Sequence, residues 1–85
     1  MASYRLLIKP SAAKELEALP KRDRQRIVGR IQGLGRDPRP PGCEKLSGAE
    51  KYRVRQGDYR VLYTVDDDAR EVVVVRIGHR RDVYR

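Results

Sequence analysis

The residue types best suited to chemistry are gathered in one short stretch, between Tyr52 and Tyr63. This stretch alternates as two strands would around Gly57-Asp58, a turn with glycine at its first central position, as a type II′ hairpin requires. A symmetric pairing then places Arg55 opposite Arg60. The register we expect is Tyr52 to Tyr63, Arg53 to Leu62, Val54 to Val61 and Arg55 to Arg60.

This pairing gathers Arg53, Arg55 and Arg60 on one face of the hairpin, and we expect no acid among them. Like charges opposite one another destabilise a sheet, whereas a good cross-strand pair contributes roughly 0.2 to 1 kcal/mol. One interpretation is a basic, solvated face of an antiparallel sheet. We favour the other, a site for a bound anion, because a local rule broken without visible compensation often marks function.

The composition describes one small, basic domain. The 85 residues carry a formal net charge of +8, which points to nucleic acid or an acidic protein as partner. We expect a single domain over residues 1–85, with no room for a deep cofactor cavity. The single cysteine, Cys43, cannot form an internal disulfide, and no apolar run is long enough for a signal peptide or a membrane span. The protein is therefore expected in the cytoplasm.

The first half of the chain predicts one strand and two helices. Tyr4–Lys9 alternates as a strand that Pro10 ends, and Ser11 is the expected N-cap of a short helix. A second helix is expected from about Lys21 to Leu34, capped by Gly35. Because so short a link joins them, the two helices should form an antiparallel hairpin that covers one face of a sheet.

The second half predicts a loop, a turn and further strands. Residues 36–50 are rich in proline and are expected to be loop. Asp66–Asp68 predicts a solvated turn, and Glu71–Ile77, with four consecutive valines, predicts a central strand covered on both faces. Together these elements give an α+β fold, a two-helix hairpin packed on a small, mainly antiparallel four-stranded sheet.

Conventional catalytic sets are missing from the sequence, which has one histidine, one cysteine, no glycine-rich phosphate loop ahead of a helix and no His/Cys cluster. We expect neither a metal nor a cofactor. His79 is interpreted as a surface or hydrogen-bonding residue rather than a catalytic base. The remaining arginines and tyrosines suit RNA cleavage by 2′-hydroxyl attack, because guanidinium groups bind phosphate oxygens bidentately. Tyr84 could transfer a proton or stack on a base, and the sequence leaves both uses open.

A second basic feature is a stripe on the second helix. Arg22, Arg26 and Arg30 follow one another at four-residue intervals and therefore share one face. Such a stripe is either a solvated polar face or, given the overall charge, a surface that contacts RNA phosphates.

With these features, the chain resembles the RelE/ParE superfamily of toxins from bacterial toxin–antitoxin systems over nearly its whole length. The most specific matching segments are Tyr52–Tyr63 and Ile77–Tyr84. The other matching segments are Lys9-Pro10-Ser11-Ala12, the helical hairpin up to Leu34, Asp37-Pro38 and Leu46-Ser47-Gly48.

The resemblance implies a curved, microbial-RNase-like version of this fold and an endoribonuclease that cleaves mRNA in the ribosomal A site without a metal. The catalytic residues that we assign on this basis are Arg60, Arg80 and Tyr84. The expected RNA-binding residues are Arg53, Arg55, His79 and Arg81, and those expected to contact the ribosome are Arg22, Arg26 and Arg30. Several RelE-type enzymes have lysine in place of Arg53 and Arg55, so proton transfer here would fall to Tyr84 or His79.

The resemblance also implies partners. These are an acidic, RelB-like antitoxin, the ribosome and mRNA, with no membrane contact. The toxin alone is expected to be a monomer and to form a hetero-oligomer with its antitoxin, whose acidic helix would lie across the helical hairpin or displace the C-terminal segment. The alternative function is that of a ParE-like inhibitor of DNA gyrase, which shares the fold but has no nuclease activity.

Overall fold

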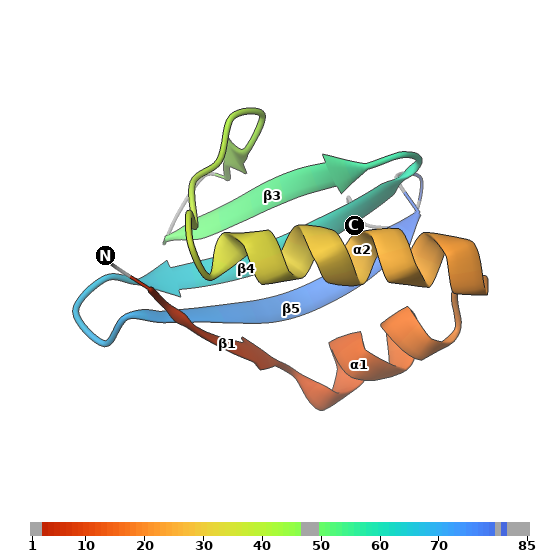
Figure 1. The fold of residues 1–85 in the computed structure, drawn as a ribbon, viewed down its shortest axis with the longest axis horizontal. Coiled ribbons are helices and arrows are strands. Elements are labelled where there is room, and N and C mark those ends of the chain that lie inside the picture. Colours follow the sequence, from red (N-terminus) through yellow and green to blue (C-terminus); the bar gives the residue numbers. More distant parts are fainter. Residues whose placement is uncertain (1–2, 47–49, 80, 82–85) are drawn as a thin grey trace.

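A computed structural model describes residues 3–46, 50–79 and 81 of the chain. Both helices lie on one side of a twisted sheet (Figure 1). The elements in chain order are β1 (Arg5–Ile8), α1 (Pro10–Glu17), α2 (Lys21–Leu34), β2 (Glu44–Lys45), β3 (Lys51–Gln56), β4 (Tyr59–Asp66) and β5 (Glu71–His79). Neither described helix is long and apolar enough to cross a membrane.

The sheet has the strand order β1-β5-β4-β3-β2. β1 is parallel to β5, and the other neighbours are antiparallel, which confirms the α+β architecture. The prediction of four strands missed β2, which lies inside the stretch expected to be loop. β2 pairs Glu44 with Arg53 and Lys45 with Tyr52. A two-residue strand is too short to leave an alternating pattern, and its extended form depends on the neighbouring edge of β3.

The ends of the helices follow backbone sterics. The first strand ends at Ile8, before Pro10 as expected, but Pro10 also begins α1, and Lys9 rather than Ser11 is the N-cap. Proline fits this position because the first N–H groups of a helix have no partner within it. Gly35 caps α2 as expected. A Cβ added at Gly35 would lie 3.3 Å from the carbonyl oxygen of Tyr4, so glycine lets β1 pass close to the end of α2.

The hairpin of β3 and β4 has the expected register at each predicted pair. Gln56 pairs with Tyr59, which leaves Gly57 and Asp58 as a two-residue turn. Gly57 has a φ of +59°, and Asp58 is not among the residues of positive φ, as a type II′ turn requires. Local turn chemistry and alternation therefore suffice to fix this pairing.

β5 is an internal strand as predicted, but it is not covered on both faces. Val72 and Val74 are buried, whereas Val73 and Val75 are half-buried, because the described helices cover one side of the sheet. The β4–β5 pairing shifts by one residue between Leu62 and Tyr63, so that Val75 forms a bulge. The bulge reverses the alternation that follows and returns Ile77 to the core.

The core lies between the helices and the sheet, and it includes Tyr63, which is fully buried. The ring of Tyr63 stacks on Tyr52 at a centroid distance of 5.8 Å, and its hydroxyl donates to the carbonyl oxygen of Pro38 at 2.6 Å. The buried apolar side chains are Ala12, Ile27, Leu34, Tyr52, Val54, Val61, Tyr63, Val65, Val72, Val74 and Ile77.

Candidate anion-binding site

Three arginines occupy the face of the sheet opposite the helices. Strand alternation buries Val54 and Val61 beneath the helices, and the intervening residues therefore point to the other face. Arg55 pairs directly with Arg60, and Arg53 lies two residues along the same face of β3. The predicted convergence of Arg53, Arg55 and Arg60 is thus present, and we call these three residues the arginine cluster.

Two members of the arginine cluster are largely withdrawn from water. Arg60 is 7% exposed, and the side chain of Arg53 is 11% exposed, whereas that of Arg55 is 61% exposed. On the other side of Arg60, the neighbouring residue of β5 is Gly78, which adds no side chain above the strand. A guanidinium taken out of water requires a nearby negative charge, because its desolvation is otherwise costly.

Glu44 supplies negative charge to the arginine cluster. Arg53 Nη2 donates to Glu44 Oε1 at 3.0 Å, and Arg55 Nη2 lies 3.8 Å from the same oxygen. The hydrogen bond from Arg53 holds the pKa of Glu44 below its usual value, and the charges of Arg55 and Arg60 lower it further. The expectation that no acid lies among the arginines was wrong, because the acid comes from β2 rather than from the hairpin.

The bulge at Val75 turns Arg76 and Gly78 of β5 toward the face of the sheet that carries the arginine cluster. Arg76 pairs with Leu62 and Gly78 with Arg60, so both share the face of the arginine cluster. Beyond Val74 the edge of β5 is no longer paired with β1, and Glu15 of α1 lies against it. The carboxylate of Glu15 accepts from the backbone N–H of Ile77 at 2.9 Å and forms an ion pair with Arg76 at 3.8 Å. This contact protects the open strand edge.

His79 lies apart from the arginine cluster. It pairs with Tyr59, which packs against the core, and the two rings meet edge to face at a centroid distance of 5.8 Å. His79 Nδ1 accepts from the backbone N–H of exposed Arg81 at 3.3 Å, so a neutral imidazole carries its proton on Nε2. The structure therefore brings Arg53, Arg55 and Arg60 together but places His79 toward the opposite face.

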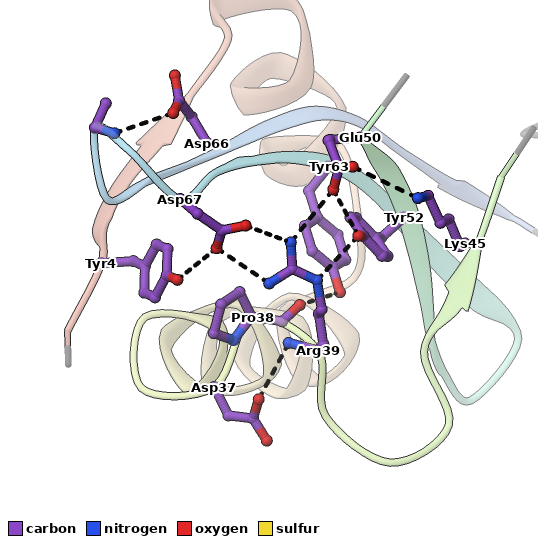
Figure 2. Close-up of polar contacts among 11 residues, drawn as sticks. Tyr4, Asp37, Pro38, Arg39, Lys45, Glu50, Tyr52, Tyr63, Asp66 and Asp67 are labelled. Carbon is purple, nitrogen blue, oxygen red and sulfur yellow. Dashed lines mark hydrogen bonds and ion pairs between the residues drawn. The ribbon is translucent and has the colours of Figure 1, made fainter. Parts of the chain in front are cut away.

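A second ionic cluster surrounds Arg39, beside Tyr52, Glu50 and Asp67, as Figure 2 shows. Arg39 Nε donates to the hydroxyl of Tyr52 at 2.9 Å, and its guanidinium carbon lies 5.0 Å from the centre of the Tyr52 ring. The two Nη atoms donate to Asp67 at 3.1 and 2.9 Å, and Nη2 also reaches Glu50 at 3.3 Å. Tyr4 completes this Arg39 cluster by donating to Asp67 at 2.6 Å.

Sequence reasoning did not find the Arg39 cluster. Asp67 was expected in a solvated turn, but hydrogen bonds from Arg39 and then Tyr4 hold its pKa below the usual value. The pKa of Glu50 is lowered first by the hydrogen bond from Tyr52 and then by that from Arg39. The cluster joins the loop after α2 to the ends of β3 and β4, which is a structural role. Within residues 3–46, 50–79 and 81, no three His, Cys, Asp or Glu side chains gather as a metal site would need.

Comparison with known proteins identifies the family. The family model described as ParE toxin of type II toxin-antitoxin system, parDE, matches residues 6–84. Toxin RelG of Mycobacterium tuberculosis is 35% identical over 86 residues, which cover 96% of this chain and 97% of that protein. The chain belongs to the RelE/ParE superfamily of type II toxins.

Solved structures of superfamily members share the whole fold. The archaeal RelE-RelB complex of Pyrococcus horikoshii contains a chain that is 30% identical with a TM-score of 0.84, covering 95% of this toxin and 99% of that chain. The toxin-antitoxin complex RelBE2 of Mycobacterium tuberculosis contains one that is 33% identical with a TM-score of 0.83, covering 96% and 97% respectively. The expected RelE-like fold is confirmed.

The remaining expected site residues of this toxin are not all placed together. Arg22 and Arg26 are exposed on α2, on the helix side of the sheet, whereas the arginine cluster lies on the other side. Arg30 is half-buried, and its Nε is buried without a hydrogen-bond partner. Arg80 and Tyr84 lie outside the described residues. The RNA and ribosome contacts assigned to these residues stay predictions.

Proposed function

We propose that this toxin is a ribosome-dependent endoribonuclease that cleaves mRNA in the ribosomal A site. The observation that supports it most is the convergence of Arg53 and Arg55 on one anionic oxygen, that of Glu44, beside the buried Arg60 with which Arg55 pairs. A phosphodiester presents the same kind of acceptor, and arginine binds it with a planar fork of donors. Fold alone would not support this proposal, because the superfamily fold also carries another activity.

The reaction requires charge stabilisation more than it requires a cofactor. The 2′-hydroxyl of the RNA attacks the adjacent phosphorus, the bond to the 5′ oxygen breaks, and the intervening state carries extra negative charge. Arg60 and Arg80 would stabilise that charge, while Arg53, Arg55 and Arg81 hold the neighbouring phosphates. Since His79 points away from the arginine cluster, we assign proton transfer to Tyr84, and any RNA contact of His79 would lie outside that cluster.

The proposed partner is an acidic, RelB-like antitoxin. The two relatives of known structure described above were solved as RelE-RelB and RelBE2 complexes. A groove of about 170 Å³ runs along β1 and α2, and its lining includes Leu7 and Ile8, which are 42% and 39% exposed. Since β1 is an edge strand and the net charge is +8, an amphipathic acidic segment matches this surface in both apolarity and charge. The toxin alone would be a monomer.

The test is to map mRNA 5′ ends on ribosomes after induction of the toxin and of an Arg60→Ala variant. Removing one preorganised donor to a transition-state anion typically lowers the rate by about 10² to 10³. The matched control is Arg36→Ala, which removes an exposed arginine of the loop after α2, outside the arginine cluster, and should change cleavage by less than about 2-fold.

A second candidate function is inhibition of DNA gyrase, which the match to the ParE toxin model favours. The same induced cells therefore receive a gyrase supercoiling assay. Growth arrest with intact mRNA and inhibited gyrase would overturn the nuclease proposal and establish this one in its place.

A further inference from the structure

We propose that Glu44 is a built-in counter-anion, which occupies the phosphate position of the arginine cluster in the free toxin and is replaced there by RNA. That the ligand replacing Glu44 is an RNA phosphate rests on the proposed function. The inference adds how the same site would be regulated in the free toxin. Its physical basis is that one carboxylate oxygen lies where the guanidinium groups of Arg53 and Arg55 converge.

The carboxylate of Glu44 differs from that of an ordinary surface ion pair, because it lies against guanidinium groups that are largely withdrawn from water, as a bound ligand would. Its carboxylate contacts Arg53, whose side chain is 11% exposed, and it also senses the charge of Arg60, which is 7% exposed. Exposed ion pairs contribute little to stability, but a carboxylate against desolvated guanidinium groups offsets a real electrostatic cost. The arginine cluster is thus preorganised around a negative charge.

Glu44 is also placed so that it can leave. Its side chain is 47% exposed, and it stands on β2, which has two residues and forms the outer edge of the sheet. A change of side-chain rotamer would remove the carboxylate without disturbing the β2–β3 pairing, since the backbone bonds of Glu44 do not depend on its side chain. A phosphodiester also carries one negative charge, so the exchange preserves the charge balance of the arginines.

As a consequence, the arginine cluster would bind RNA that another macromolecule holds in place in preference to RNA that is free in solution. A substrate from solution must compete with a carboxylate that is tethered beside the arginines at high effective concentration. RNA fixed by another macromolecule also has a high effective concentration and can displace Glu44. In this way Glu44 weakens the binding of free RNA and of small anions, and it makes presentation on the ribosome a requirement.

The experiment measures binding without cleavage. The probe is a fluorescent 2′-O-methyl trinucleotide, which lacks the attacking hydroxyl, and its dissociation constant is measured by anisotropy for the wild type and Glu44→Gln. We expect binding by Glu44→Gln to be about 5- to 30-fold tighter, because a unit charge near the phosphate has been removed. The slope of log Kd against log salt should steepen by up to about 0.7, as expected when one more phosphate is neutralised by a free cation.

The matched control is Glu71→Gln. Glu71 is also a strand glutamate in an ion pair, with Arg5. It lies on β5 opposite Asp66, the last residue of β4, whereas Arg60 lies near the first residue of β4. Since both variants change the net charge equally, an effect of overall charge alone would appear in both. We expect Glu71→Gln to change the dissociation constant by less than about 2-fold. Equal affinities of the two variants, or weaker binding by Glu44→Gln, would overturn the proposal.

Two further measurements keep the result decisive. Glu44→Asp retains the negative charge but has a side chain shorter by one methylene, so it should bind the probe with an affinity between those of the wild type and Glu44→Gln. If Glu44→Gln fails to fold, a wild-type affinity of Glu44→Asp would overturn the proposal. Inorganic pyrophosphate serves as a second probe that needs no RNA chemistry. If the wild type cleaves no mRNA on ribosomes yet Glu44→Gln binds pyrophosphate more tightly, the proposed function fails and this inference stands.

Discussion

The two ionic clusters of this toxin share the same short strands but distribute charge in opposite ways. In the Arg39 cluster one guanidinium is bound by the two carboxylates of Glu50 and Asp67. In the arginine cluster three guanidinium groups act on the carboxylate of Glu44. The first arrangement uses its charges to hold the chain together, whereas the second presents positive charge to a ligand.

β2 and β3 supply both clusters because neighbouring residues of a strand point to opposite faces. Tyr52 belongs to the Arg39 cluster and Arg53 to the arginine cluster. The partner residues on β2 divide in the same way, since Lys45 lies 3.5 Å from Glu50 while Glu44 contacts Arg53. Two neighbouring residues on β2, Glu44 and Lys45, and two on β3, Tyr52 and Arg53, therefore link the Arg39 cluster to the arginine cluster.

The largest expected effect is that alanine at Arg60 lowers cleavage activity, whereas alanine at Arg39 lowers mainly the free energy of unfolding. Arg60→Ala should lower ribosome-dependent cleavage by about 10² to 10³, because it removes a donor to the reacting phosphate. Arg39→Ala should leave cleavage within about 3-fold but lower the free energy of unfolding by about 1 kcal/mol, discounted for the partial exposure of its ion pairs. Cleavage rates and urea unfolding of both variants test this, and comparable losses of cleavage in the two would erase the distinction between the clusters.

A smaller effect is expected at Tyr63, which connects the Arg39 cluster to the core through its stacking on Tyr52. Tyr63→Phe removes the hydrogen bond to the Pro38 carbonyl and leaves that buried oxygen without its donor. The free energy of unfolding should fall by about 1–3 kcal/mol, measured by urea unfolding. Tyr59→Phe is the control, since the Tyr59 side chain is only half-buried, and an equal loss there would contradict the assignment.

The smallest expected effect is a difference in acid sensitivity. Asp67 and Glu50 have pKa values lowered in the folded state, so the unfolded chain binds more protons, and stability rises with pH. Their contribution is complete above their ordinary values of about 4 and is lost as the pH falls through the lowered folded values. Asp67→Asn should therefore flatten the dependence of Tm on pH between about pH 5 and pH 2. The neighbouring variant Asp68→Asn is the control, and it should follow the wild-type curve.

Local patterns in the sequence predicted the hairpin register and the arginine convergence. Alternation and the Gly57 turn act over a few residues, so the pairing of Arg55 with Arg60 could be derived without tertiary information. The crowding of like charges led to the prediction of a bound anion, which stays a prediction, while the structure places a carboxylate of the chain itself among the arginines. That the anion is Glu44 could not be derived, because β2 has two residues and its pairing depends on the finished edge of β3.

Other features depend on contacts that no local pattern records. Arg39 lies in a proline-rich loop, and its partners Asp67 and Tyr52 are brought to it by the end of the sheet. The face on which His79 lies depends on the bulge at Val75, which is one residue among four valines and leaves no mark in the sequence. Simple alternation from Val74 would have placed His79 opposite the core.

The bulge at Val75 gives β5 one residue more than its partner β4 needs at this point. Val74 and Arg76 pair with Tyr63 and Leu62, which are consecutive residues of β4. Deleting Val75 would therefore restore simple alternation while Arg76 and Gly78 keep the face of Arg60 and Ile77 stays in the core. A reading-frame-preserving loss of this one codon would straighten the strand without exchanging the inside and outside of its second half.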